Sequence, residues 1–153
     1  MERLQAGRIA LDLEKKMVLL SGPRQVGKSW LARSLMATFR EPRYLNYDNS
    51  QDRDIIRSMQ WPGTTDLLVL DEFHKMPDWK SHLKGICDTR PPQLRILVTG
   101  SARLETFRQG GDSLAGRYFH HRLLPLSPAE TRAAGAGVDI DRHQGRGRLD
   151  GQR

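Results

Sequence analysis

Short apolar runs are the most regular feature of the chain. Residues 17–20 and 67–70 are apolar throughout, and 95–99 has an apolar centre, which is typical of strands covered on both faces of a sheet. Residues 43–47 alternate between apolar and polar side chains, and residues 118–124 are the last predicted strand. The pattern therefore predicts five strands.

Helical spacing of apolar residues separates these strands. Trp30, Leu31, Leu35, Met36 and Phe39 recur at the spacing of one helix face directly after the first strand. Further helices are predicted at 2–16 (with a break at Gly7), at 52–60, at 77–88 (with Asp78 as the cap) and from about 103 to Gly110-Gly111. Strands that alternate with helices predict an α/β fold with a mostly parallel sheet and right-handed crossovers.

The periodic pattern ends near Ala133. Residues 133–153 contain almost no apolar side chains and are rich in Gly and Arg, so a disordered tail is predicted there. The remaining residues, 1–132, are enough for one domain.

The chain carries a formal net charge of +7, and its basic residues are scattered along its whole length. This distribution favours a solvated surface with some arginines at a phosphate site, while nucleic-acid binding stays an unsupported alternative. Cys87 is the only cysteine, which predicts a small core residue and no intrachain disulfide. No apolar run reaches membrane-spanning length and the N-terminus lacks a secretory signal, so we expect a cytoplasmic protein without a membrane partner.

Residues 22–29 read Gly-Pro-Arg-Gln-Val-Gly-Lys-Ser, the phosphate-loop pattern of nucleoside triphosphate sites. Its glycines allow backbone N–H groups to turn inward, and the helix that follows directs its positive end at the same anion. Lys28 is expected against the β- and γ-phosphates, and Ser29 is expected to bind Mg²⁺. The predicted ATP-contacting residues of this segment are Gly22, Pro23, Arg24, Gln25, Val26, Gly27, Lys28, Ser29 and Trp30.

An acidic pair, Asp71-Glu72, follows the apolar run 67–70. The carboxyl ends of parallel strands form the ligand-binding edge of open α/β sheets. Asp71 is expected to hold Mg²⁺ together with Ser29, and Glu72 to orient and polarise an attacking water. An ordinary polar loop is the alternative, and the upstream phosphate loop disfavours it.

Two later segments can complete such a site. Thr99 and Ser101 end a neighbouring strand, and a hydroxyl from either could contact the γ-phosphate or the attacking water. Their spacing alone does not choose between them. Arg117 precedes the last strand and could stabilise charge in the transition state, although surface arginines are common.

The histidines are weaker candidates. His120 and His121 are adjacent on a predicted strand, so their side chains point to opposite faces and cannot jointly hold a metal. His74 could approach the site, but polar packing at the start of a helix is the simpler interpretation. We expect no protein-bound metal besides the Mg²⁺ that arrives with nucleotide.

Several segments together resemble one family. They are Gly-Pro-Arg-Gln-Val-Gly-Lys-Ser, Leu-Asp-Glu-Phe-His-Lys-Met-Pro-Asp-Trp, Ile-Leu-Val-Thr-Gly-Ser-Ala, Ser-Leu-Ala-Gly-Arg and Leu-Pro-Leu-Ser-Pro-Ala-Glu. In this order they resemble the predicted ATPases of bacteria and archaea in the AAA+ superfamily, whose members usually carry a nuclease-like C-terminal domain of unknown function. The resemblance covers about 9–131.

This resemblance implies the three-layer sandwich of a P-loop NTPase, built on a five-stranded sheet that binds ATP and Mg²⁺. It also implies that a helical lid and often a neighbouring subunit's arginine complete the site, so a homo-oligomer is a candidate assembly. By position it assigns Lys28 and Ser29 to the first Walker motif, Asp71 and Glu72 to the second, Thr99 or Ser101 to the sensor, and Arg117 to the Leu-Ala-Gly-Arg segment.

The chain departs from the family pattern in three ways. Trp30 stands where a small hydroxyl residue is more usual, and His74 stands where a glutamine is common. Family chains also continue well past residue 153, which predicts a truncated sequence with no lid.

The sequence favours an ATP-binding AAA+ core that hydrolyses ATP to ADP and phosphate with Mg²⁺. One alternative is a nucleotide-dependent binding module without turnover, which the short chain would suit. A second is a small-molecule phosphoryl kinase with Arg103, Arg108 and Arg117 as lid arginines. Asp71-Glu72 disfavours the kinase, because this pair suits the activation of water.

Overall fold

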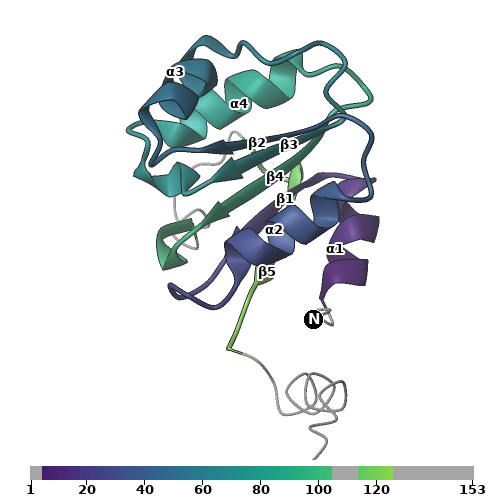
Figure 1. Ribbon diagram of the computed structural model, residues 1–153, viewed down its shortest axis with the longest axis vertical. Coiled ribbons are helices and arrows are strands. Elements are labelled where there is room, and N and C mark those ends of the chain that lie inside the picture. The colour runs from purple at the N-terminus through teal and green to yellow at the C-terminus, as the bar shows by residue number, and fades with distance from the viewer. Residues whose placement is uncertain (1–4, 105–113, 126–153) are drawn as a thin grey trace, which may run out of the picture.

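The computed structural model describes residues 5–104 and 114–125 of the chain. Parallel strands form a five-stranded sheet in the order β2-β3-β4-β1-β5. Helices α1 and α2 cover one face of the sheet, and α3 and α4 cover the other (Figure 1). The predicted α/β architecture with a parallel sheet is thereby confirmed.

In chain order the elements are α1 (Ala6–Leu13), β1 (Met17–Ser21), α2 (Lys28–Met36), β2 (Pro42–Asn46), α3 (Ser50–Ser58), β3 (Leu67–Asp71), the 3₁₀ turn η1 (Phe73–Lys75), α4 (Trp79–Thr89), β4 (Arg95–Gly100) and β5 (Tyr118–Arg122).

Capping explains two differences from the predicted helices. Helix α3 begins at Ser50 rather than at 52, because the Asn49 side chain accepts hydrogen bonds from the backbone N–H groups of Gln51 and Asp52. Asp78 occupies the N-cap position of α4 but, against the prediction, its side chain makes no capping hydrogen bond. Its backbone is left-handed, with φ of 57°, whereas a capping residue is normally extended.

The ends of the chain differ from the prediction in smaller ways. Gly7 lies inside α1 rather than breaking it, and β5 ends at Arg122 rather than at 124. Most of the predicted helix that starts near 103, and the whole of the predicted tail at 133–153, lie outside the described residues. None of the helices in 5–104 and 114–125 is long and apolar enough to cross a bilayer.

Alternate residues of each central strand pack into two separate cores. In β1, Met17 and Leu19 face α3 and α4, where they join a fully buried cluster with Ile56 and Leu83. Val18 and Leu20 face α1 and α2 instead and join the second cluster. Because both faces are covered, the central strands carry unbroken apolar runs at 17–20, 67–70 and 96–98.

Strand order decides which chain segments meet. β4 lies between β1 and β3, with Leu20 paired to Thr99 and Leu70 paired to Val98. All five strands are parallel, so their carboxyl ends share one edge of the sheet. The loop after β1, the acidic pair after β3 and the end of β4 therefore converge there.

Candidate functional site

The loop between β1 and α2 approaches its neighbours too closely for side chains at its first position. A Cβ on Gly22 would lie 2.4 Å from the backbone oxygen of Leu123, which follows β5. At the other end of the loop, Gly27 has φ of 94°, a left-handed conformation that most side chains resist. The two glycines of the phosphate-loop pattern are thus required for separate steric reasons, close approach to Leu123 at Gly22 and a left-handed backbone at Gly27.

Helix α2 begins directly at this loop, and no side chain caps it. The first N–H groups of a helix have no partner within the helix and carry its positive end. In α3 the Asn49 side chain fills that role, whereas in α2 the uncapped end, from Gly27 to Trp30, lines a cavity. An anion is the natural partner for this helix end.

The cavity has a volume of about 400 Å³. Its wall combines cations, carboxylates and an indole from three places along the chain: the loop and α2, the end of β2, and the segment after β3. The lining residues are Arg24, Gln25, Gly27, Lys28, Ser29, Trp30, Asp48, Glu72 and Lys75.

The Lys28 side chain is folded back over the loop. Its ammonium donates hydrogen bonds to the backbone oxygens of Gly22 at 2.8 Å and Pro23 at 2.7 Å, and Lys28 is only 7% exposed. Burial lowers the pKa of Lys28 below its ordinary value, while the nearby carboxylates of Glu72 and Asp71 act in the opposite direction. The ammonium therefore lies at the cavity wall with two uncharged carbonyl partners.

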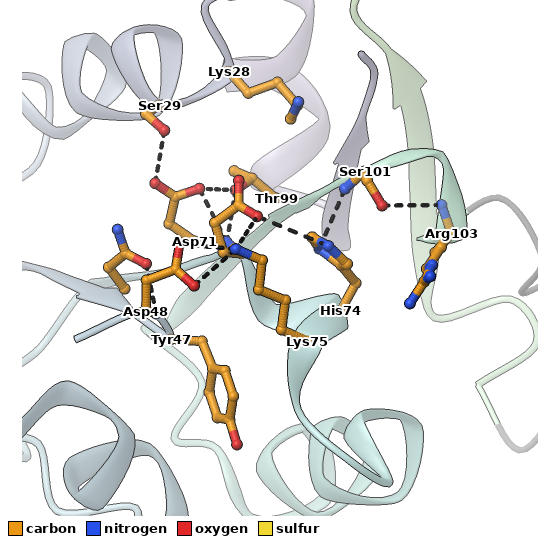
Figure 2. Close-up of polar contacts among 12 residues, drawn as sticks. Lys28, Ser29, Tyr47, Asp48, Asp71, His74, Lys75, Thr99, Ser101 and Arg103 are labelled. Carbon is orange, nitrogen blue, oxygen red and sulfur yellow. Dashed lines mark hydrogen bonds and ion pairs between the residues drawn. The ribbon is translucent and has the colours of Figure 1, made fainter. Parts of the chain in front are cut away.

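Asp71 is the most heavily bonded side chain of the site (Figure 2). Its Oδ2 accepts a hydrogen bond from the Ser29 hydroxyl at 2.7 Å and another from the Tyr44 hydroxyl. Its Oδ1 accepts from the Thr99 hydroxyl and from the backbone N–H of Glu72 at 3.0 Å. The carboxylate is 1% exposed, so these donors hold it in one orientation.

Tyr44 is a site residue that the sequence pattern did not indicate. It lies on β2, which pairs with β3 so that Asn46 is opposite Asp71 and Tyr44 is two residues earlier on the same face of the strand. Burial, followed by the hydrogen bond to Asp71, raises the pKa of Tyr44 to about 12. The phenol therefore stays protonated and keeps donating its hydrogen bond at neutral pH. Tyr44 lies three positions before the end of the predicted strand 43–47, but its contact with Asp71 depends on the pairing of β2 with β3, which the local pattern does not contain.

Glu72 follows Asp71 in a left-handed conformation, with φ of 56°. Its Oε2 lies 3.4 Å from the Lys75 ammonium and 3.8 Å from Nε2 of His74. Lys75 also contacts Asp48, with its ammonium 2.8 Å from Oδ1. The structure thus brings His74 to the site, where packing at a helix start had been the simpler interpretation.

The two candidate sensor hydroxyls have different partners. Thr99 is fully buried, donates to Asp71 and accepts a weak hydrogen bond from the Glu72 N–H at 3.4 Å. The Ser101 hydroxyl accepts from the backbone N–H of Arg103 at 3.3 Å, and the Ser101 N–H donates to Nδ1 of His74 at 3.2 Å. Both residues therefore lie at the same sheet edge, but only Thr99 contacts Asp71.

Seven predicted site residues do not line the cavity, and four of them, Gly22, Asp71, Thr99 and Ser101, have the contacts at its edge given above. The other three are Pro23, Val26 and Arg117. Pro23 contributes its backbone oxygen to Lys28, and Val26 packs against the core beneath α1 and α2. Arg117 precedes β5, whose first residue pairs with the first residue of β1, so it lies at the amino edge of the sheet, opposite the cavity. There it forms an ion pair with Asp88 of α4.

The remaining titratable candidates have structural partners. His120 lies 2.7 Å from the Ser21 hydroxyl, and His121 lies 2.7 Å from Asp12, so the adjacent histidines do point to different elements. The Cys87 thiol lies 3.7 Å from the sulfur of Met17, and burial raises its pKa.

Comparisons with known proteins agree with this arrangement. A family model described as an AAA domain matches residues 14–132. The chain belongs to the AAA+ superfamily. Over 126 residues it is 31% identical to an uncharacterized protein of Mycobacterium bovis and equally to one of Mycobacterium tuberculosis. The match covers 80% of this chain and 27% of each relative, so the chain spans about a quarter of their length.

A solved structure shares the fold of this AAA domain. It is a DNA polymerase III gamma subunit-related protein of Thermotoga maritima, with a TM-score of 0.59 and 14% sequence identity. The match covers 90% of this chain and 51% of that protein. The family and the fold together identify a nucleotide-binding AAA+ protein, with its loop, acidic pair and strand ends at one sheet edge.

Proposed function

We propose that this AAA domain binds Mg²⁺-ATP in the cavity at the carboxyl edge of its sheet and hydrolyses it to ADP and phosphate. One observation carries the proposal: the Ser29 hydroxyl at the start of α2 lies 2.7 Å from Oδ2 of Asp71 at the end of β3. This contact joins the phosphate loop to the acidic pair, the two elements that a triphosphate-hydrolysing site requires.

The cavity suits a chain of phosphates. Arg24, Lys28 and Lys75 place three cations in its wall, and the uncapped N-terminus of α2 adds backbone N–H donors. Lys28 would exchange its two carbonyl partners for phosphate oxygens, which accept stronger, charge-assisted hydrogen bonds. Both glycines of the loop keep the backbone bare enough for close approach.

The oxygen atoms of Ser29 and Asp71 suit Mg²⁺, which prefers hydroxyl, carboxylate and water oxygens. Bound Mg²⁺ would neutralise charge on the phosphate oxygens. Tyr44 and Thr99 orient the Asp71 carboxylate, so that its position does not depend on the ion.

Glu72 is the residue placed to accept a proton from water. It lines the cavity one residue beyond Asp71, and its side chain is 26% exposed. In the reaction the water oxygen bonds to the γ-phosphorus, and the bond from that phosphorus to the bridging oxygen breaks. ADP leaves with the electron pair, and the proton of the water passes to Glu72 and then to solvent.

The hydrogen-bond pattern favours Ser101 over Thr99 as the hydroxyl that contacts phosphate or water. Thr99 has committed its one hydroxyl proton to Asp71. Among the described residues, the Ser101 hydroxyl oxygen accepts one hydrogen bond, from the Arg103 N–H, and donates none. Its proton therefore stays available to a ligand.

Arg117 can act on phosphate only in a second copy of the chain, because it lies at the opposite edge of the sheet from its own cavity. Its side chain is 45% exposed, which leaves it accessible to a partner. A homo-oligomer in which Arg117 reaches the neighbouring site is therefore part of the proposal.

Nucleotide titration tests the binding step. Lys28→Ala should weaken Mg²⁺-ATP affinity by about 10–100-fold in calorimetry, since it removes hydrogen bonds to a charged ligand. Lys84→Ala, on the surface of α4, is the matched control and should bind like the wild type. Equal and undetectable binding by the wild type and by Lys28→Ala would contradict the proposal.

Phosphate release tests the chemical step. Wild-type turnover that Glu72→Gln lowers by roughly 10²–10⁴-fold, with binding retained, supports hydrolysis. Tight binding without turnover in the wild type would instead support the binding module. Transfer of labelled phosphate to an added small-molecule acceptor would support the kinase alternative.

A further inference from the structure

Two side chains approach the Glu72 carboxylate on the side of its Oε2 atom. Nε2 of His74 and the ammonium of Lys75 both approach Oε2, at 3.8 Å and 3.4 Å. Oε2 is the carboxylate oxygen of Glu72 that both contacts involve, and among the described residues no side chain donates a hydrogen bond to Oε1. Glu72 lines the cavity, so its carboxylate is within reach of a water molecule there.

His74 is fixed from the side of β4. The Ser101 N–H donates to its Nδ1 at 3.2 Å, so a neutral His74 carries its proton on Nε2, the nitrogen that faces Glu72. The ring packs tightly against the end of β4, because a Cβ on Gly100 would come within 2.6 Å of Nδ1. The side chain is 7% exposed, which restricts it to this orientation.

Lys75 is fixed from the side of β2. Its ammonium donates to both carboxylate oxygens of Asp48, at 2.8 Å and 2.9 Å, while it contacts Glu72. Figure 2 shows Lys75 and His74 extending from η1 toward the same place, with Asp48 to the left of Lys75 and Ser101 above His74 on the right. Asp48 also balances the charge of Lys75, so that Glu72 is not its sole counter-ion.

We propose that His74 and Lys75 are positioning residues for hydrolysis, which hold Oε2 of Glu72 so that Oε1 is presented to the attacking water. The inference rests on the function proposed above. A general base must lie within hydrogen-bond reach of the proton that it accepts, and a glutamate side chain alone has several rotatable bonds. The Lys75 ion pair and the nearby Nε2–H of His74 both favour one direction of the carboxylate, with Oε2 turned toward them. This direction leaves the lone pairs of Oε1 to the water.

Steady-state phosphate release by the full chain separates positioning from binding. His74→Ala and Lys75→Met should each lower kcat by about tenfold, a part of the roughly 10²–10⁴-fold effect of a positioned general base. His74→Ala should leave KM nearly unchanged. His74→Gln should restore most of kcat, because a glutamine amide can accept from Ser101 and donate to Glu72. Lys84→Met is the matched control, with an unchanged kcat.

The Glu72→Gln background shows whether the two residues act through Glu72. There, His74→Ala and Lys75→Met should cause no further loss of the residual rate. The same fold-loss in both backgrounds would overturn the inference. If the wild type turns over ATP and both His74→Ala and Lys75→Met keep its kcat, this inference is contradicted but the proposed function is not. Absence of wild-type turnover would contradict the proposed function, and this inference with it.

Nitrogen NMR of the His74 ring tests the arrangement without nucleotide or turnover. The ring should be the Nε2–H tautomer. Burial lowers the pKa of His74 most, Glu72 raises it, and Lys75, Arg103 and Lys28 lower it further. Glu72→Gln should therefore lower the His74 pKa and Lys75→Met should raise it. An Nδ1–H tautomer, or a pKa that Glu72→Gln does not move, would overturn the inference.

Discussion

The Tyr44 hydroxyl donates a hydrogen bond to Oδ2 of Asp71, the oxygen that also accepts from Ser29. Tyr44 lies on the edge strand β2, whereas Ser29 lies on α2. The guanidinium of Arg33 lies over the Tyr44 ring, 4.6 Å from the ring centre. The proposed Mg²⁺-binding carboxylate is therefore supported from a strand that carries no Walker motif.

Replacing Tyr44 by phenylalanine should lower the affinity for Mg²⁺ while leaving the fold intact. The ring still packs, but Asp71 loses one of the donors that orient it, a change that typically costs about tenfold or more in metal affinity. The measurement is Mg²⁺ titration of ATP binding. Tyr47→Phe is the control, because its hydroxyl contacts Arg57 rather than Asp71. Equal Mg²⁺ affinities for both variants would argue against a role for Tyr44.

Protonation of His74 should reduce folding stability in mild acid. Burial lowers the pKa of His74 below 6.5, its ordinary value. Above that value both the folded and the unfolded states hold the neutral ring, and the full stability is present. As the pH falls below about 6.5, the unfolded state takes up the proton first, so the free energy of unfolding decreases until the pH passes the folded-state pKa.

Urea unfolding of the wild type and of His74→Gln would measure this effect. A range from about pH 7.5 to about pH 5 is suitable, because it includes the ordinary histidine pKa. Glutamine does not titrate, so the variant should show the shallower dependence on pH. Carboxylates elsewhere contribute equally to both proteins and cancel in the difference. Parallel curves would show that His74 does not titrate differently in the folded chain.

Two glycine substitutions should change stability in opposite directions. Gly22→Ala places a Cβ 2.4 Å from the backbone oxygen of Leu123, which cannot rotate away, and should destabilise the fold by about 1–3 kcal/mol. Gly85 lies inside α4 with no atom within 4 Å of the added Cβ, so Gly85→Ala should stabilise by about 0.5–1 kcal/mol. Chemical unfolding of both variants checks the sign. A stable Gly22→Ala protein with wild-type ATP affinity would mean that the loop tolerates a side chain.

Local patterns predicted the parts of this site that lie close together in sequence. The phosphate loop and Asp71-Glu72 have fixed spacings next to apolar runs, because each occupies one turn at a strand end. Tyr44 could not be found this way, because its contact with Asp71 depends on β2 pairing with β3, a relation that no local pattern contains. His74 and Ser101 likewise meet only because β4 lies beside β3.

The place of Arg117 follows from the sequence once the strands are taken as parallel. A residue that precedes a parallel strand must lie at the amino edge of the sheet, while the phosphate loop follows a strand and lies at the carboxyl edge. The sequence therefore already separated Arg117 from Lys28 by the length of a strand. Only a second chain can bring the two together.

Arg117→Ala should accordingly affect turnover but not nucleotide binding. If Arg117 serves the site of a neighbouring copy, wild-type kcat per chain should rise with protein concentration, and Arg117→Ala should remove this rise. Affinity for Mg²⁺-ATP at low protein concentration should be unchanged, because Arg117 is bonded to Asp88 at the far edge of the sheet. Arg43→Ala, an exposed arginine on β2, is the matched control. Weaker ATP binding by dilute Arg117→Ala would instead place this arginine within its own site, and a concentration-independent kcat would exclude a shared one.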